Sequence, residues 1–352
     1  MFRSGPVLVI RVGAFGDMVQ FSAVGAALAD HHDQPVDVLS EGGFAAEALT
    51  SMPEVARRFA MRHRRRPVWL APDLLRLARS LAERRYAHVY VFDRAPLIEQ
   101  ALAASGALLH VIAPSPRLVH GLDGYAAALA GEGIAVPSSF LPRVVATTAE
   151  RNAARGLVAG HGLGSRPLLV IQAGNARTLH PLHRLRPTRD LKAWPTASWI
   201  GVIEGLARMH PEAGMVLAGA PAEWSVAEDI RAGLPRTVAA RCANLAQELP
   251  IRTLAGLLAE ATGCLSVDTG PAHLAAALGC PLTVLFGPAD PAEMAPRGPA
   301  PVAVVRSGVA CSPCYGTARR YACRENVCMR QIGVTDVLAA WSSMRVAERR
   351  VA

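Results

Sequence analysis

Residues 266–288 read Ser-Val-Asp-Thr-Gly-Pro-Ala-His-Leu-Ala-Ala-Ala-Leu-Gly-Cys-Pro-Leu-Thr-Val-Leu-Phe-Gly-Pro, and this stretch decides the fold. It predicts a buried strand that ends in an acid–hydroxyl–glycine turn, an alanine-rich helix that begins at Pro271, and a second buried strand. Proline suits the first helical position because its missing N–H would have no helical partner there. The first N–H groups of a helix attract an anion, and Gly270 would let a phosphate approach them closely.

The same turn has a purely structural alternative. Thr269 could cap the helix, Asp268 could be an exposed acid, and His273 could be a histidine packed in the core. The sequence alone leaves both interpretations open for each of these residues.

Short apolar runs alternate with helical patterns along the rest of the chain, which is typical of βαβ units. Strands are expected near 7–12, 36–39, 88–92, 107–112, 168–172, 214–218, 264–267, 282–286 and 302–305. Helices are expected near 17–30, 44–51, 72–85, 96–104, 196–209, 222–232, 251–261, 271–278 and 335–347. This order predicts an α/β protein of two Rossmann-like, doubly wound domains, 1–155 and 165–333, followed by a C-terminal helical segment, 334–352.

The composition is that of a well-buried globular protein. The chain has 352 residues, of which 51% are hydrophobic and 18% charged. Glycines and prolines interrupt the longest uncharged stretch, 269–289, which argues against a membrane-spanning helix there. Arg11 and Asp17 interrupt the apolar run that a signal peptide would need, so we expect a cytoplasmic protein.

The formal net charge is +9, and Lys192 is the one lysine among the 37 basic residues. Arginines cluster at Arg57, Arg58, Arg62, Arg64, Arg65 and Arg66. No aromatic residues interleave with them and no nucleic-acid module lies nearby, so nucleic acid is not the expected partner. An anionic membrane surface or a phosphorylated glycolipid suits the cluster better, and a solvated face without a partner is the alternative.

The 266–288 stretch resembles the signature of glycosyltransferase family 9, the ADP-heptose:lipopolysaccharide heptosyltransferases. That signature is D-[TS]-G-x-x-H-L-A-A-A-L-G-x-P, followed by a strand and F-G-P, and every defined position is filled here. The resemblance implies a GT-B arrangement, with two Rossmann-like domains facing a cleft. The first domain would bind the acceptor and the second an ADP-sugar donor, and the C-terminal helix would pack back on the first domain.

Further residues take roles from this resemblance. The Gly16-Asp17 pair after the first strand resembles the family's start, where the aspartate is the proposed general base, and Gly13 and Gly16 would line the acceptor side with Arg62, Arg64, Arg65 and Arg66. Residues 188–195 resemble the T-x-x-K-x-W-P element, in which Thr188 and Lys192 would contact the diphosphate. Glu223 would bind the ribose or base. The donor site would be completed by Asp268, Thr269, Gly270, Pro271, Ala272 and His273.

Four of the seven cysteines form a C-x2-C-x8-C-x4-C pattern: Cys311, Cys314, Cys323 and Cys328. Their close spacing suits a structural zinc or iron site, and some relatives that glycosylate bacterial surface proteins are thought to hold iron in such a loop. The chain has no Asp-x-Asp pair, which is the usual element of metal-assisted sugar transfer. We therefore expect no cofactor in catalysis and a metal, where present, only as a structural clip.

These features predict an inverting, metal-independent transferase that moves heptose from ADP-heptose to an acceptor hydroxyl of the lipopolysaccharide inner core. We expect it to make peripheral contact with the inner face of the cytoplasmic membrane. Alternatives are transfer to a protein, use of another nucleotide-sugar, or a nucleotide-binding scaffold without transfer activity. A nicotinamide-dependent oxidoreductase is disfavoured because neither half has the G-x-G-x-x-G fingerprint.

Overall fold

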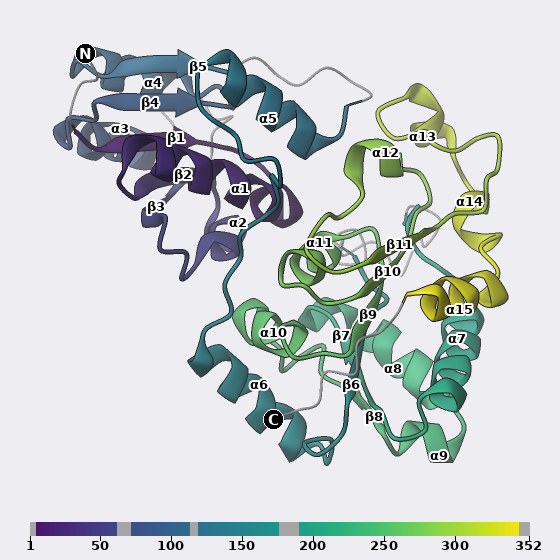
Figure 1. Ribbon diagram of the computed structural model, residues 1–352. Helices are drawn as coiled ribbons and strands as arrows, with labels where there is room; N and C mark the ends of the chain where they lie inside the picture. The colour runs from purple at the N-terminus through teal and green to yellow at the C-terminus, as the bar shows by residue number, and fades with distance from the viewer. Residues whose placement is uncertain (1–4, 62–71, 113–118, 176–189, 345–352) are drawn as a thin grey trace. The chain divides into compact units, whose positions relative to one another are not determined.

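The structure is a computed structural model that describes residues 5–61, 72–112, 119–175 and 190–344. The chain divides into two compact units, Met1–Val145 and Ala146–Ala352 (Figure 1). Each unit is built on one parallel β-sheet with helices on both faces. The predicted α/β class and the two doubly wound sheets are confirmed.

The first unit contains a five-stranded parallel sheet in the order β3-β2-β1-β4-β5. Its strands are β1 (Val7–Ile10), β2 (Val36–Glu41), β3 (Val55–Met61), β4 (His88–Val91) and β5 (Leu108–Val111). Its helices are α1 (Phe15–His32), α2 (Gly43–Ala46), a 3-10 turn η1 (Glu47–Leu49), α3 (Pro72–Glu83), α4 (Pro96–Ala104) and α5 (Gly121–Gly131). Helices α3 and α4 pack on one face of the sheet through residues such as Leu81 and Ile98, and α1 packs with α5.

The second unit contains a six-stranded parallel sheet in the order β11-β10-β9-β6-β7-β8. Its strands are β6 (Leu168–Gln172), β7 (Gly214–Ala218), β8 (Cys242–Asn244), β9 (Gly263–Val267), β10 (Leu282–Leu285) and β11 (Val302–Val305). Its helices are α6 (Thr148–Gly160), α7 (Thr196–Met209), a 3-10 turn η4 (Pro221–Glu223), α8 (Trp224–Ala232), α9 (Arg236–Ala239), α10 (Ile251–Leu258), α11 (Gly270–Ala277), α12 (Pro291–Met294), α13 (Ala318–Ala322), α14 (Val327–Arg330) and α15 (Val334–Ser343).

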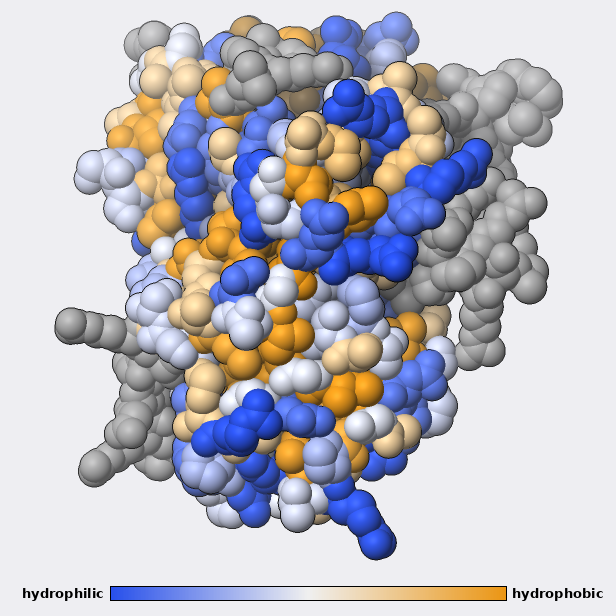
Figure 2. Space-filling view, turned by 90° about the vertical axis from the view of Figure 1, so that its right-hand side faces the viewer, coloured by the Kyte–Doolittle hydropathy of each residue, from blue (hydrophilic) through white to orange (hydrophobic). Residues whose placement is uncertain are grey.

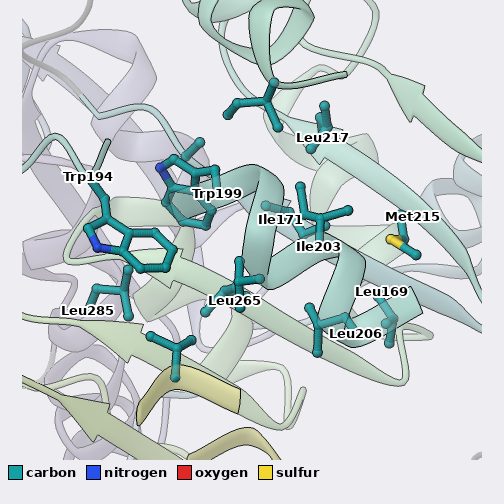
Figure 3. Close-up of a cluster of buried hydrophobic side chains, with 14 of the residues drawn as sticks. Leu169, Ile171, Trp194, Trp199, Ile203, Leu206, Met215, Leu217, Leu265 and Leu285 are labelled. Atoms are coloured by element: carbon teal, nitrogen blue, oxygen red, sulfur yellow. The ribbon is translucent and has the colours of Figure 1, made fainter. Parts of the chain in front are cut away.

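The core of the second unit lies between its sheet and helices α7, α8 and α15 (Figure 3). Alternate strand residues such as Leu169 and Ile171 point toward Trp199, Ile203 and Leu206 of α7, because successive side chains of a strand face opposite sides. The rings of Trp194 and Trp199 meet edge to face, with centroids 5.0 Å apart. This cluster fixes the chain immediately after Lys192.

The C-terminal helix packs within the second unit. Helix α15 packs on α7 and on strands β10 and β11 of the second unit, where Trp341 is fully buried and donates from Nε1 to Nε2 of His210 over 3.1 Å. Its described part therefore contributes to the second unit's core, and the expected packing of the C-terminal segment on the first domain stays a prediction. Residues 345–352 lie outside the described residues.

Two edge strands also go beyond the prediction. Strand β3 contains Arg57 and Arg58, both exposed, and β8 is only three residues long. Charged residues on an edge strand discourage pairing with other chains. Because β3 carries such residues, it lacks the apolar run by which a buried strand is recognised in a sequence. The basic cluster therefore begins on a sheet edge.

No helix in the described part of the chain is long and apolar enough to cross a membrane. On the face shown in Figure 2, hydrophobic side chains are interspersed with hydrophilic ones.

Candidate functional site

Each sheet has one point at which the strand order reverses, and the sequence-predicted residues lie at these points. In the first sheet the reversal falls between β1 and β4, and in the second between β6 and β9. Ligands of open α/β sheets bind beyond the carboxyl ends of the strands at such a reversal. The two sets of residues are therefore described separately, one for each sheet.

At the first reversal, Asp17 lies in the opening turn of α1 and is exposed. Its Oδ2 accepts a hydrogen bond of 2.9 Å from the backbone N–H of Ala14, which precedes the helix. Gly13 gives this turn its room, because a Cβ there would lie 2.7 Å from the Cβ of Asp17. Gly16 is half-buried beside it. A side chain at Gly13 would push the carboxylate out of place.

Three residues that the sequence did not single out surround this turn. Arg11 follows β1 and forms an ion pair with Asp93, which follows β4, so the pair bridges the two strands at the reversal. Arg11 Nε also donates to the hydroxyl of Tyr125 over 3.0 Å, and Asp93 Oδ2 accepts from the N–H of Val12 over 2.8 Å.

Electrostatic interactions between Arg11 and its neighbours keep Arg11 charged. Burial opposes the charged form of Arg11, but Tyr125, Asp93 and Asp17 outweigh it and raise the pKa of Arg11 above its usual value. Burial likewise raises the pKa of Tyr125. Arg11 therefore stays a cation and Tyr125 stays a neutral hydroxyl near neutral pH, so Asp17 stands beside a fixed positive charge.

At the second reversal, Lys192 and Asp268 form an ion pair. Lys192 Nζ donates to Asp268 Oδ2 over 2.6 Å and to the backbone carbonyl of Asp268 over 2.9 Å. The side chain of Lys192 is 19% exposed and that of Asp268 is 7% exposed. Asp268 is thus the partner of the lysine and not the exposed acid of the structural alternative.

The chain that carries Lys192 is fixed on both sides. Asp190 is buried and accepts from Nδ2 of Asn175, at 2.9 and 3.0 Å, and from the N–H of Lys192 at 3.1 Å. Trp194 is buried in the core and donates from Nε1 to the carbonyl of Ile332 over 3.2 Å. The lysine is therefore presented by a backbone with little freedom to shift.

Glu223 closes the turn that follows β7. It is 5% exposed, and its Oε2 accepts from the N–H of Ala220 over 2.6 Å and from Nε2 of Gln172 over 3.4 Å. Burial raises the pKa of Glu223 and the nearby Asp190 adds to the rise, while the hydrogen bonds from Ala220 and Gln172 oppose it. A Cβ on Gly174 would lie 2.2 Å from Oε1 of Glu223, so the carboxyl group is packed against that backbone.

The signature turn begins α11 as the sequence predicts. Thr269 is extended, and its carbonyl accepts from the N–H groups of Ala272 and His273 at 3.0 and 3.4 Å. Thr269, Gly270 and Pro271 are half-buried, whereas Ala272 and His273 are buried. Pro271 occupies the first turn of the helix, and no side-chain cap from Thr269 is formed there.

Several predicted residues lie outside the described residues, namely Thr188, Arg62, Arg64, Arg65 and Arg66.

In the described part of the chain, the four clustered cysteines lie near one another but do not form a group of metal ligands. Cys314 and Cys328 are buried, Cys323 is half-buried and Cys311 is exposed, and all four are free thiols. Their proximity adds to burial in raising the pKa of Cys328 to about 11. Across the described ranges, no three His, Cys, Asp or Glu side chains are placed to hold one metal ion. The geometry thus does not fit the structural zinc or iron that the spacing suggested.

Comparison with known proteins locates the similarity in the second unit. Residues 183–324 match the family model of glycosyltransferase family 9 (heptosyltransferase), a range that includes Lys192, Glu223 and Asp268. The chain is 39% identical over 125 residues to lipopolysaccharide heptosyltransferase 1 of Pseudomonas aeruginosa and 32% identical over 100 residues to lipooligosaccharide heptosyltransferase 2 of Haemophilus influenzae. These alignments cover 35% and 28% of this chain, and they span 32% and 28% of the two relatives.

Solved structures extend the likeness in fold to nearly the whole chain. The E. coli ADP-heptose lipopolysaccharide heptosyltransferase II matches with a TM-score of 0.73 at 20% identity, covering 96% of this chain and 98% of that one. An E. coli heptosyltransferase solved with ADP matches with a TM-score of 0.64 at 19% identity, covering 96% and 99%. The family model and the curated relatives thus show that residues 183–324 of this chain are similar to glycosyltransferase family 9, and the solved structures show that the chain shares the fold of heptosyltransferases.

Proposed function

We propose that this protein transfers a heptose from ADP-heptose to an acceptor hydroxyl in the inner core of lipopolysaccharide. The observation that carries the proposal is the Lys192–Asp268 pair at the reversal of the second sheet, inside the range that matches the family model. Support also comes from the curated relatives, which are heptosyltransferases of lipopolysaccharide and lipooligosaccharide.

In this proposal the second unit binds the donor. Lys192 contacts the diphosphate, and its ion pair with Asp268 sets the direction of the ammonium group. The half-buried turn at Thr269 and Gly270 offers backbone N–H groups at the start of α11, where a phosphate is favoured. Glu223 supports the turn after β7, on which the nucleoside would lie, and Thr188 is assigned to the diphosphate as well.

Asp17 is the proposed general base. Its carboxylate accepts the proton of the acceptor hydroxyl while that oxygen forms a bond to the anomeric carbon of the heptose. The bond from the anomeric carbon to the phosphate oxygen breaks, and ADP leaves with the electron pair. Attack from the face opposite ADP inverts the configuration. Lys192 stabilises the negative charge that grows on the leaving phosphate.

No step of this mechanism uses a metal ion. Lys192 and the start of α11 supply the positive charge that the leaving group needs. The iron-containing dodecameric heptosyltransferase TibC has the same general fold, with a TM-score of 0.50 at 14% identity. We do not propose an iron site for this chain, because the four clustered thiols are not placed as ligands in the part that the structure describes.

The first unit is assigned to the acceptor. An anionic glycolipid suits the positive net charge and the arginine cluster that begins on β3, of which Arg62, Arg64, Arg65 and Arg66 are proposed contacts together with Gly13 and Gly16. Such an acceptor places the protein at the inner face of the cytoplasmic membrane, held by peripheral contact. A protein acceptor is the competing assignment.

The test is a transfer reaction with ADP-heptose and extracted lipopolysaccharide core, followed by mass spectrometry of the acceptor. We expect a gain of one heptose with the wild-type protein and a loss of at least about a hundredfold in rate with Asp17→Asn, the scale of a general base. Asp30→Asn removes an exposed carboxylate at the other end of α1 and should react like wild type.

The outcomes separate the alternatives. Binding of ADP-heptose without transfer to the lipid core would point to a protein acceptor. Absence of both binding and transfer would refute the proposed function. Full activity in Asp17→Asn would leave the reaction standing and remove Asp17 from it.

A further inference from the structure

The segment that carries the first two clustered cysteines lies against the donor side of the second sheet. The backbone N–H groups of Cys314 and Tyr315 both donate to the carbonyl of Pro288 over 2.8 Å, and Ser312 Oγ donates to the carbonyl of Gly287 over 2.5 Å. Gly287 and Pro288 follow Phe286 after the end of β10, and β10 is the neighbour of β9, which leads into Asp268. These hydrogen bonds fix Tyr315 at the carboxyl ends of the strands.

Tyr315 joins the donor lysine to a second cation. Lys192 Nζ lies 5.7 Å from the centroid of the Tyr315 ring, and the guanidinium carbon of Arg320 lies 4.0 Å from the same centroid. The Arg320 guanidinium is also 5.7 Å from the ring of Tyr321. A stack of this kind orients a guanidinium while leaving its N–H groups free to donate.

Lys192 and Arg320 differ in their partners. Lys192 has Asp268 as its carboxylate partner, whereas Arg320 forms neither an ion pair nor a side-chain hydrogen bond with any residue in the described ranges. In the described ranges, Arg320 is therefore a cation near Lys192 without a carboxylate of its own, whereas Asp268 pairs with the lysine and Asp190 binds the lysine's backbone N–H. Arg320 is half-buried, so it is held near this place instead of extending into water.

We propose that Arg320 is a second phosphate-binding residue of the donor site and that Tyr315 is the positioning residue that holds it there. The ligand is the diphosphate of a nucleoside diphosphate or of its sugar ester. A guanidinium suits this task because it can donate two parallel hydrogen bonds to one phosphate. This inference rests on the proposed function, since it adds a residue to the same donor site.

The experiment is calorimetric titration of the full-length protein with ADP and with AMP. Arg320→Gln is expected to weaken ADP binding about tenfold, the loss that follows from removing one charge-assisted contact, and to weaken AMP binding less. Arg319→Gln is the matched control, because Arg319 is an exposed arginine on the same short helix and should bind ADP as the wild type does.

Two variants of Tyr315 test whether its ring positions Arg320 or only supports the fold. Tyr315→Phe keeps the ring and is expected to keep ADP affinity within about twofold, whereas Tyr315→Ala should lower it nearly as far as Arg320→Gln. Tryptophan fluorescence and circular dichroism of each variant report whether the second unit is folded.

Three results would overturn the inference. Unchanged ADP affinity in Arg320→Gln would show that Arg320 does not contact the diphosphate. An equal loss of ADP affinity in Arg319→Gln and Arg320→Gln would show that the two arginines act only through their general positive charge. Wild-type protein that binds neither ADP nor ADP-heptose removes the proposed function and this inference together, whereas normal ADP binding with an unaffected Arg320→Gln removes this inference alone.

Discussion

Replacing Lys192 by methionine is expected to destabilise the second unit by about 3 kcal/mol, and the estimate follows from the ion pair with Asp268. The Nζ–Oδ2 distance is 2.6 Å, and the Asp268 side chain is 7% exposed. Two unit charges about 3 Å apart attract by about 5 kcal/mol at an effective dielectric of about 20, and the desolvation of both groups offsets most of that gain.

The variant keeps the desolvation cost and loses the attraction. Asp268 becomes a buried carboxylate without its cation, and its backbone carbonyl also loses the donor at 2.9 Å. Removing one partner of such a pair costs about 3–5 kcal/mol. We expect the lower end, because the lysine side chain is 19% exposed and water can reach the space that it leaves.

The assay is urea unfolding followed by tryptophan fluorescence. Four of the five tryptophans belong to the second unit, namely Trp194, Trp199, Trp224 and Trp341, so the signal reports mainly on that unit. The double variant Lys192→Met/Asp268→Asn carries no charge at the pair and should be more stable than Lys192→Met alone. The expected coupling between the two positions is about 2 kcal/mol. A loss below about 1 kcal/mol in Lys192→Met, or strictly additive effects, would refute this account of the pair.

Three further predictions concern other parts of the molecule. Burial, together with His88, His31 and His110, lowers the pKa of His32 to about 4. Between pH 6.5 and 4 the unfolded chain therefore binds more protons than the folded one, and the first unit should lose about 2 kcal/mol of stability as pH falls. His32→Gln should flatten this dependence when unfolding is measured as a function of pH, and an unchanged slope would exclude His32 as its source. The raised pKa of Glu223 gives a pH dependence of stability of the opposite sign. Its stabilising contribution is complete below the pKa of the unfolded chain, about 4.3, and is lost as pH rises through the pKa of the folded protein. Glu223→Gln should remove that loss, and identical pH profiles of thermal unfolding for the variant and the wild type would contradict this. Gly256→Ala should destabilise the second unit by about 2–3 kcal/mol, because the new Cβ would lie 2.2 Å from the backbone oxygen of Glu150 on α6; wild-type stability in urea unfolding would show that the two helices separate at little cost.

The apolar strands could be predicted from the sequence, because runs of Val, Ile and Leu bounded by turn residues mark a buried parallel strand. Strands β1, β6, β7, β9, β10 and β11 lie where the pattern placed them. The charged β3 and the three-residue β8 could not be found in this way, since pairing with a neighbouring strand, and not a local pattern, makes them strands. Helix α5 is also absent from the prediction, because its three glycines and its alanine run give a weak helical period.

The residues of the candidate sites likewise divide into those that a local motif indicates and those that only the fold brings together. Lys192 and the turn at Asp268 could be singled out from their motifs, but nothing local indicates that residues 76 positions apart form one ion pair. Arg11, Asp93 and Tyr125 were missed for the same reason, since only the order of the strands brings them together. The one available signal was positional: each of Arg11 and Asp93 directly follows, or nearly follows, a buried strand.

The two reversals are built on a common plan. At each one, a basic side chain that follows the strand on one side pairs with a carboxylate that follows the strand on the other, Arg11 with Asp93 and Lys192 with Asp268. Helices leave the sheet on opposite faces at a reversal, so no helix ties these two strand ends together and an ion pair can do so. The two pairs differ in what stands beside them. An exposed carboxylate, Asp17, which accepts the N–H of Ala14, lies next to the first, and Arg320, a cation without a carboxylate partner among the described residues, lies near the second. The first reversal is therefore suited to accepting a proton and the second to holding an anion, which is the division of labour that a sugar transfer from a nucleoside diphosphate requires.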